Sequence, residues 1–169
     1  MKGNIFLIGF MGTGKSTISK ALKRMLHMEC MEMDEMIEEK QGMPIPEIFE
    51  KYGENYFRDV ESQLLRELRE GEDVIVSCGG GVVVRPENIG YMKDSGKVVL
   101  LSATPETVYE RVKHSTNRPI LNGNMNVEYI GELMEKRREK YQAAADIVIA
   151  TDGKTTEEIC REICKALKG

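Results

Sequence analysis

The stretch from Gly9 to Thr17, which reads Gly-Phe-Met-Gly-Thr-Gly-Lys-Ser-Thr, decides the fold of this chain. It fits the pattern G-x-x-x-x-G-K-[ST], with Gly9, Gly14, Lys15 and Ser16 at the fixed positions. A glycine turn that only joins a strand to a helix has no need of the Lys-Ser pair. The pattern therefore predicts a phosphate-binding loop, which indicates a nucleotide but does not specify a reaction.

The residues around this loop predict the secondary structure that it requires. Residues 4–8 predict a short buried strand, and residues 16–26 predict the helix that follows the loop. Gly9, Gly12 and Gly14 allow positive φ, so that successive backbone N–H groups can surround a phosphate at the positive end of the helix.

Two side chains of the loop have separate chemical roles. Lys15 is placed to follow negative charge on the β- and γ-phosphates, and the Ser16 hydroxyl is placed to ligate Mg²⁺. The nucleotide-binding residues predicted in this stretch are Gly12, Thr13, Gly14, Lys15, Ser16 and Thr17.

Length and charge limit the classes of protein to consider. A chain of 169 residues is most simply one domain, residues 1–169. This domain must then bind both the nucleotide and the second substrate of any reaction. Its 24 Lys and Arg residues against 28 Asp and Glu residues leave a formal net charge of −4. This charge does not favour binding to nucleic acid or to an anionic membrane, so any anion site must be a local cluster of Arg and Lys.

The cysteines and the first residues of the chain point to the cytoplasm. Cys30, Cys78, Cys160 and Cys164 form no C-x-x-C pair and predict reduced thiols. The first apolar run is too short for a signal peptide or a membrane span. We expect a cytoplasmic protein, and we expect a monomer because no long exposed apolar face stands out.

Strands and helices are predicted to alternate along the whole chain. The predicted strands are residues 4–8, 29–33, 74–76, 97–102 and 146–150. The predicted helices are residues 16–26, a helix with Asp34 as its N-cap, 46–71 with an interruption at Gly53, 86–93, 104–114, 127–143 and 155–167. This alternation predicts an α/β fold with one parallel sheet and helices on both faces.

Three further segments are predicted to reach the edge of the sheet where ligands bind. Glu32-Met33-Asp34 ends the second strand and Gly79-Gly80-Gly81 follows the third, and open α/β sheets bind ligands at these carboxyl ends. Three consecutive glycines cost chain entropy, which indicates that something approaches the backbone closely. The turn-rich residues 115–126 predict a mobile lid that carries Arg118.

Together with the phosphate loop, these segments resemble the shikimate kinase family. The resemblance covers nearly the whole chain and rests on residues 9–16, Asp34, Phe57-Arg58, Gly79-Gly80-Gly81, Arg118-Pro119-Ile120-Leu121, and Arg137 before Tyr141. It implies a three-layer P-loop kinase fold with a five-stranded parallel sheet. It also implies a substrate-binding helical region at about residues 34–60 and a mobile lid at about residues 114–126.

The resemblance further implies transfer of the γ-phosphoryl group of ATP to the 3-hydroxyl of shikimate. Asp34 would bind ring hydroxyls and orient or deprotonate the attacking one, while Lys15 and Arg118 would stabilise charge on the transferring group. The remaining implied ligand contacts are Arg111, stacked on adenine, and the shikimate-binding residues Arg58, Gly79, Gly80, Gly81 and Arg137. Arg suits these roles because its planar fork pairs bidentately with carboxylate or phosphate and stacks on a ring.

Two positions depart from the family pattern. The family usually has Asp-x-Asp where this chain has Glu32-Met33-Asp34, and the first acid helps to hold Mg²⁺. Glu32 can take that role with one more methylene group. The family often has a Pro beside the adenine after the last strand, whereas residues 151–156 contain none.

Several alternatives remain at this point. A related kinase for another hydroxylated acid, such as gluconate, or for a nucleoside monophosphate would share the phosphate loop and the lid. A non-catalytic nucleotide sensor is expected to lose Asp34 or Arg118, and both are present. A GTPase is expected to carry Asn-Lys-x-Asp, which this sequence lacks. Binding of a partner through the acidic surface helices is the least specific alternative.

Overall fold

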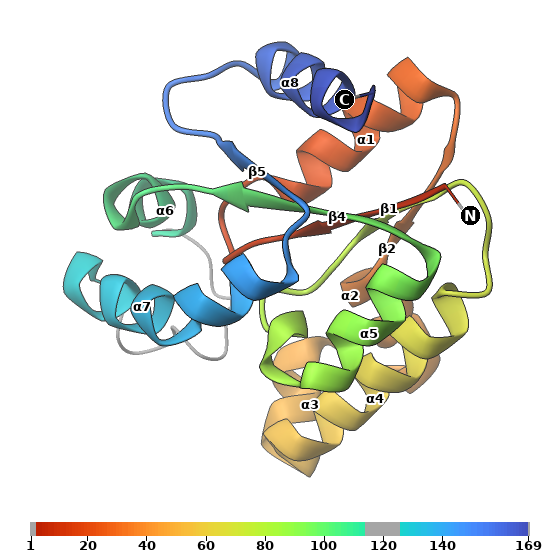
Figure 1. The fold of residues 1–169 in the computed structure, drawn as a ribbon. Helices are drawn as coiled ribbons and strands as arrows, with labels where there is room; N and C mark the ends of the chain where they lie inside the picture. Colours follow the sequence, from red (N-terminus) through yellow and green to blue (C-terminus); the bar gives the residue numbers. More distant parts are fainter. Residues whose placement is uncertain (1–2, 114–125, 169) are drawn as a thin grey trace.

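A computed structural model describes residues 3–113 and 126–168, and its framework is one five-stranded sheet (Figure 1). The strands are β1 Asn4–Ile8, β2 Glu29–Glu32, β3 Val74–Ser77, β4 Gly96–Ser102 and β5 Ile147–Ala150. All neighbouring strands are parallel, in the order β2-β3-β1-β4-β5. The carboxyl ends of all the strands consequently share one edge of the sheet.

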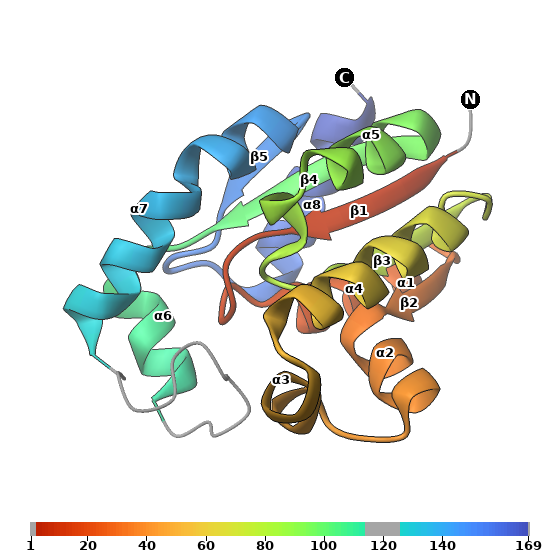
Figure 2. The ribbon, with the colours of Figure 1, turned by 90° about the horizontal axis from the view of Figure 1, so that it is seen from below.

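Helices cover both faces of the sheet, which confirms the predicted three-layer α/β fold. They are α1 Lys15–Leu26, α2 Met33–Gln41, α3 Ile45–Tyr52, α4 Glu54–Leu68, α5 Pro86–Ser95, α6 Pro105–Val112, α7 Val127–Ala144 and α8 Thr156–Lys168, with the 3₁₀ helix η1 Val82–Val84. Helices α1 and α8 lie on one face, and α4, α5 and α7 lie on the other (Figures 1 and 2).

The central strand β1 shows why both faces need a cover. All its residues are buried, and side chains along a strand alternate between the two faces of a sheet. Phe6 and Ile8 pack in the core beneath α4, α5 and α7, whereas Ile5 and Leu7 pack in the core beneath α1 and α8. The two apolar layers fix the direction in which β1 enters the phosphate loop.

The start of α2 differs from the prediction. Strand β2 ends at Glu32, and Glu32 rather than Asp34 occupies the N-cap position of α2. Met33 is fully buried and is the first residue of α2, so the helix begins two residues earlier than an N-cap at Asp34 requires. The predicted N-cap role of Asp34 is therefore wrong. Asp34 instead lies in the first turn of α2, where its exposed side chain reaches the carboxyl edge of the sheet.

Three helix boundaries place side chains of the site. The long helix predicted before β3 is two helices, α3 and α4, which meet at Gly53. Thr104 caps α6 by accepting a first-turn backbone N–H at 3.2 Å, and Asn126 caps α7 in the same way at 2.7 Å. These caps fix the starts of the helices that carry Arg111 and Arg137.

The predicted lid, residues 114–126 with Arg118, lies outside the described residues except for Asn126. Within residues 3–113 and 126–168, no helix has the length and apolar character that a membrane crossing requires.

Candidate active site

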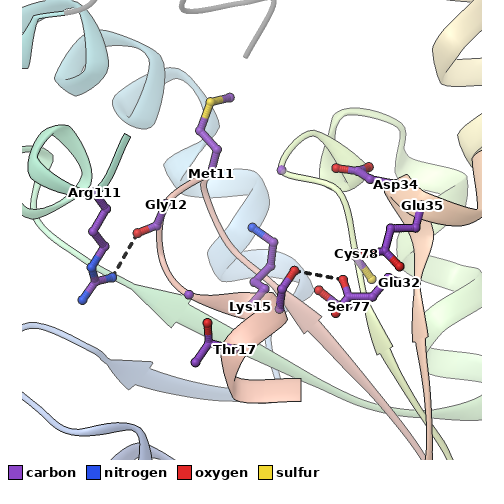
Figure 3. Close-up of a pocket in the computed structure, with 13 residues that line it drawn as sticks. Met11, Gly12, Lys15, Thr17, Glu32, Asp34, Glu35, Ser77, Cys78 and Arg111 are labelled. Carbon is purple, nitrogen blue, oxygen red and sulfur yellow. Dashed lines mark hydrogen bonds between the residues drawn. The ribbon is translucent and has the colours of Figure 1, made fainter. Parts of the chain in front are cut away.

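A cavity of about 480 Å³ opens at the carboxyl edge of the sheet (Figure 3). It brings together the phosphate loop, the end of β2, the start of α2 and the segment after β3. The residues that line it are Met11, Gly12, Gly14, Lys15, Ser16, Thr17, Glu32, Asp34, Glu35, Ser77, Cys78, Gly80 and Arg111. Most of the predicted nucleotide residues and both predicted metal residues thus meet at one place, together with Asp34 and Gly80 of the predicted acceptor residues.

The phosphate loop has the backbone geometry of an anion cradle. Gly12 and Gly14 have φ values of 81° and 95°, which glycine adopts without strain. Lys15 begins α1, and its Nζ donates to the carbonyl oxygens of Gly9 at 2.7 Å and Phe10 at 3.1 Å. The ammonium group therefore lies over the loop, close to the N-terminus of α1, where a phosphate is favoured.

Ser16 and Glu32 meet across the space between α1 and β2. The Ser16 hydroxyl donates to Glu32 Oε2 at 2.9 Å, and both residues line the cavity. Mg²⁺ prefers oxygen ligands and is commonly bound by one or two protein groups together with the phosphates of its substrate. The two residues present therefore fit the predicted metal position.

Arg111 lies at the nucleotide end of the cavity. Its Nη1 donates to the Gly12 carbonyl at 3.0 Å, as Figure 3 shows, and to Thr151 Oγ1 at 3.4 Å. Thr151 is buried, and its hydroxyl donates to the Ser102 carbonyl at 2.9 Å. The guanidinium group is thus held between the phosphate loop and the segment after β5, beside the predicted adenine position.

Thr13 differs from the other predicted nucleotide-binding residues. Its side chain is 1% exposed, and its hydroxyl donates to the Phe10 carbonyl at 2.8 Å. Its backbone N–H donates to the same carbonyl at 3.3 Å. Thr13 is not among the residues that line the cavity, and these contacts stabilise the turn of the loop from the inside.

Two carboxylates lie against the first glycine of the triplet. A Cβ atom at Gly79 would lie 3.0 Å from Asp34 Oδ1 and 2.7 Å from Glu61 Oε2. Any side chain at this position would have to displace both groups, so the site needs glycine for close approach. Asp34 therefore stands directly beside the triplet, at the carboxyl edge of the sheet where both segments were expected.

Arg58 and Glu61, both on α4, form a buried ion pair behind the triplet. Arg58 Nη1 lies 2.9 Å from Glu61 Oε1, and the side chains are 5% and 0% exposed. Burial raises the pKa of Glu61, and the charge and hydrogen bond of Arg58 oppose that shift. A Cβ atom at Gly81 would lie 2.4 Å from the Arg58 guanidinium nitrogens. The pair thus holds this guanidinium against the glycine backbone, and its other N–H groups can serve a substrate carboxylate.

Helix α7 brings a second guanidinium to the same loop. Arg137 is 8% exposed, and its Nη1 donates to the Gly80 carbonyl at 3.3 Å. Tyr141, one turn further along α7, donates its hydroxyl to the same carbonyl. Burial raises the pKa of Tyr141, so its hydroxyl stays protonated as a donor. Arg58 and Arg137 therefore approach one glycine loop from two different helices.

The predicted residues are not all at the cavity surface. Arg58, Gly79, Gly81 and Arg137 lie behind its wall and do not line it among the described residues. Arg118 lies outside the part of the chain that the structure describes, so its role stays a prediction.

Glu61 is a site residue that the sequence interpretation missed. It lies three residues after Arg58 and three before Leu64, on the apolar face of α4. A Glu at a core position, one turn from an Arg, is the signal that could have identified it, because a buried carboxylate needs a charged partner.

A phosphate loop that faces carboxylates across one cavity, with two guanidinium groups held against the glycine triplet beside it, is the arrangement of a P-loop kinase with a small polar acceptor. Fold and site place this chain in that class.

Comparison with known proteins specifies the family. The family model described as "Shikimate kinase" matches residues 11–168. A shikimate kinase of Dehalococcoides mccartyi is 41% identical over 167 residues, which cover 99% of this chain and 94% of the relative. The chain therefore belongs to the shikimate kinase family, whose members are ATP-dependent kinases.

Solved structures agree with this assignment. The shikimate kinase of Acinetobacter baumannii in complex with shikimate has a TM-score of 0.95 at 32% identity, covering 99% of this chain and 94% of the neighbour. The shikimate kinase of Aquifex aeolicus has a TM-score of 0.86 at 40% identity, covering 98% and 96%. The predicted family, fold and enzyme class are thus confirmed.

Proposed function

We propose that this chain transfers the γ-phosphoryl group of ATP to the 3-hydroxyl of shikimate and releases shikimate 3-phosphate and ADP. The observation that carries the proposal is the meeting of Asp34 and Arg58 at one glycine triplet, beside a phosphate loop. A carboxylate binds hydroxyl groups and a guanidinium binds a carboxylate, so the pair suits a polyhydroxylated acid.

The acceptor residues bind different groups of shikimate. Arg58 and Arg137 bind its carboxylate, and the triplet of Gly79, Gly80 and Gly81 forms the floor under its ring. Asp34 orients the attacking hydroxyl and accepts its proton as the bond to phosphorus forms.

The nucleotide residues position ATP and neutralise charge. Gly12, Gly14 and Thr17 form the cradle around the phosphates, and Thr13 supports the turn of that loop from the inside. Arg111 stacks on adenine, and Lys15 and Arg118 stabilise charge on the transferring group. Phosphoryl transfer depends mainly on positioning and charge neutralisation, so little covalent chemistry is needed from the protein.

The divalent cofactor that we propose is Mg²⁺. When bound with ATP, it supplies positive charge that balances the β- and γ-phosphates. Ser16 and Glu32 hold it, which agrees with their oxygen chemistry and with their contact at 2.9 Å.

We also propose that residues 1–169 form a single domain with a substrate-binding region at about 34–60 and a lid at about 114–126. We further propose that it is a cytoplasmic monomer. The net charge of −4 disfavours binding to nucleic acid or to an anionic membrane.

The test is ADP release from Mg·ATP with shikimate, gluconate and nucleoside monophosphates as acceptors, with the product identified by phosphorus NMR. We expect turnover with shikimate and a product phosphorylated at the 3-hydroxyl. Turnover with gluconate or a nucleoside monophosphate, and none with shikimate, would overturn the proposal while leaving the kinase class intact.

A further inference from the structure

A second serine of α1 contacts the carboxylate of Glu32. Ser19 is fully buried, and its Oγ lies 3.0 Å from Glu32 Oε1, while Ser16 occupies Oε2 of the same carboxylate at 2.9 Å. Ser16 and Ser19 are three residues apart and lie on the same face of the helix. Each oxygen of Glu32 therefore has its own hydroxyl partner.

The Ser19 hydroxyl has two acceptors within reach. Its Oγ also lies 2.9 Å from the backbone carbonyl of Ser16, which is the ordinary local partner of a serine inside a helix. A hydroxyl has one hydrogen, and a carboxylate can only accept, so the two acceptors compete for the same proton. Hydrogen bonds to a charged acceptor are about twice as strong as neutral ones, which directs this proton toward Glu32.

The length of Glu32 gives this contact a purpose. An aspartate at this position would be roughly 1.5 Å shorter, by one carbon–carbon bond. The longer side chain has one more rotatable bond, and its freedom must be lost when the carboxylate is held in one place. Two hydroxyl groups on a rigid helix hold both Glu32 oxygens before any ligand binds. The conformational entropy of the Glu32 side chain is therefore lost when the protein folds and not when the metal binds.

We propose that Ser19 is a positioning residue that holds the Glu32 carboxylate ready for Mg²⁺ in the nucleotide complex. The inference rests on the Mg·ATP chemistry of the proposed function. It assigns a role to a buried hydroxyl that does not line the cavity. Partners behind a metal-binding carboxylate typically change metal affinity by 10- to 100-fold when they are removed.

The test measures the Kd of ADP by titration calorimetry in excess Mg²⁺ and in EDTA, and the ratio of the two values reports the contribution of Mg²⁺. We expect Ser19→Ala to reduce this ratio on the order of tenfold and to leave the Kd in EDTA unchanged. The matched control is Ser95→Ala. Ser95 is also buried, its hydroxyl has no hydrogen-bond partner among the described residues, and it lies at the opposite end of the sheet, next to the start of β4.

A double-mutant cycle with Glu32→Asp separates positioning from a general structural effect. The shorter carboxylate no longer reaches Ser19, so Ser19→Ala in that background should change the ratio by less than about twofold. An unchanged ratio in Ser19→Ala alone, or an equal loss in both backgrounds, would overturn the inference. If wild-type protein binds ADP equally well with and without Mg²⁺, the metal proposal itself fails and the role of Ser19 fails with it.

Discussion

The phosphate loop and Gly80 of the glycine triplet line one cavity, but the two loops need glycine for different reasons. In the phosphate loop, Gly12 and Gly14 have φ values of 81° and 95°, so the backbone conformation itself requires glycine. Gly81 of the triplet has an ordinary φ of −100°, but a Cβ atom there would lie 2.4 Å from Arg58 nitrogens. A Cβ atom at Gly12 would also lie 2.8 Å from Val112 Cγ1, so the phosphate loop needs glycine for conformation and in part for space, whereas Gly81 needs it for space alone.

The same contrast holds for the polar groups. The nucleotide side gathers its groups mainly from one contiguous stretch, Gly9 to Thr17, together with a helix N-terminus. The acceptor side takes side chains from three helices, with Asp34 on α2, Arg58 on α4 and Arg137 on α7. The proposed acceptor site therefore depends on tertiary packing. Substitutions on this side should alter the KM for shikimate without altering the KM for ATP.

The largest expected effect is the loss of the proposed base. Asp34→Asn keeps the size of the side chain but removes its charge, so kcat should fall by about 10²- to 10⁴-fold, as is typical for loss of a general base. Steady-state kinetics with shikimate should show a nearly unchanged KM for ATP. Glu35→Gln is the matched control, because Glu35 is the next residue and lines the same cavity. Equal losses in the two variants would contradict the assignment to Asp34.

The buried ion pair of the acceptor side should dominate stability. Arg58→Leu leaves Glu61 buried without its partner, and we expect the free energy of unfolding to fall by about 3–5 kcal/mol. Arg85→Leu removes an ion pair with the exposed Asp59, where the N–O distance is 2.6 Å. That surface pair should contribute only about 0–1 kcal/mol. Urea unfolding measures the free energy of unfolding of both variants. Similar losses would show that the buried Arg58–Glu61 pair contributes no more than a surface pair.

The pH dependence of Arg58→Leu follows from the raised pKa of Glu61. Burial already raises this pKa, and removal of Arg58 raises it further, so the folded state binds a proton that the unfolded state releases. The Arg58→Leu variant therefore loses stability as pH rises through the pKa that Glu61 has in the folded state. The deficit against wild type should be smaller at about pH 5 than at about pH 8. A deficit that grows toward acid would contradict this.

Substitution of one glycine in each loop separates the two regions directly. Gly81→Ala should displace the Arg58 guanidinium and raise the KM for shikimate on the order of tenfold to a hundredfold, with little change for ATP. A Cβ atom at Gly14 meets nothing within 4 Å, so Gly14→Ala introduces only backbone strain of about 1–2 kcal/mol. Gly14→Ala should raise the KM for ATP and leave the KM for shikimate nearly unchanged. Kinetics with each substrate varied in turn check both variants, and a reversed pattern would break the comparison.

The smallest expected effect is the slow alkylation of Cys78, which lies on the cavity wall between the two regions. Burial, and next the negative charge of Glu61, raises the pKa of this thiol, so it should remain protonated at mildly alkaline pH. Mass spectrometry after treatment with iodoacetamide should find Cys30 and Cys164, which are half-buried, alkylated before Cys78. Labelling of Cys78 at the rate of Cys30 would contradict the described burial.

The nucleotide side could be predicted from the sequence, because its chemistry depends on consecutive backbone groups. The parallel sheet was also predictable, since strands and helices alternate and β1 is buried throughout. Thr13 is the exception, because its inward hydrogen bonds depend on how the loop turns.

The acceptor side could be predicted only in part. Arg58 and Arg137 are isolated in sequence, and only the family resemblance connected them. Glu61 was missed although its partner Arg58 lies one turn earlier on the same helix, because its burial depends on how α4 packs against the triplet. The N-cap prediction for Asp34 failed because the burial of Met33 starts α2 earlier than side-chain capping preferences indicate.

The most direct test of the acceptor side uses a substrate without its charge. Shikimate methyl ester keeps every hydroxyl group but presents no carboxylate to Arg58 and Arg137. We expect kcat/KM for the ester to be on the order of 10²-fold below that for shikimate, with the KM for ATP unchanged. If the ester is phosphorylated as efficiently as shikimate, the two guanidinium groups do not recognise the acceptor, and the account of this half of the cavity is wrong.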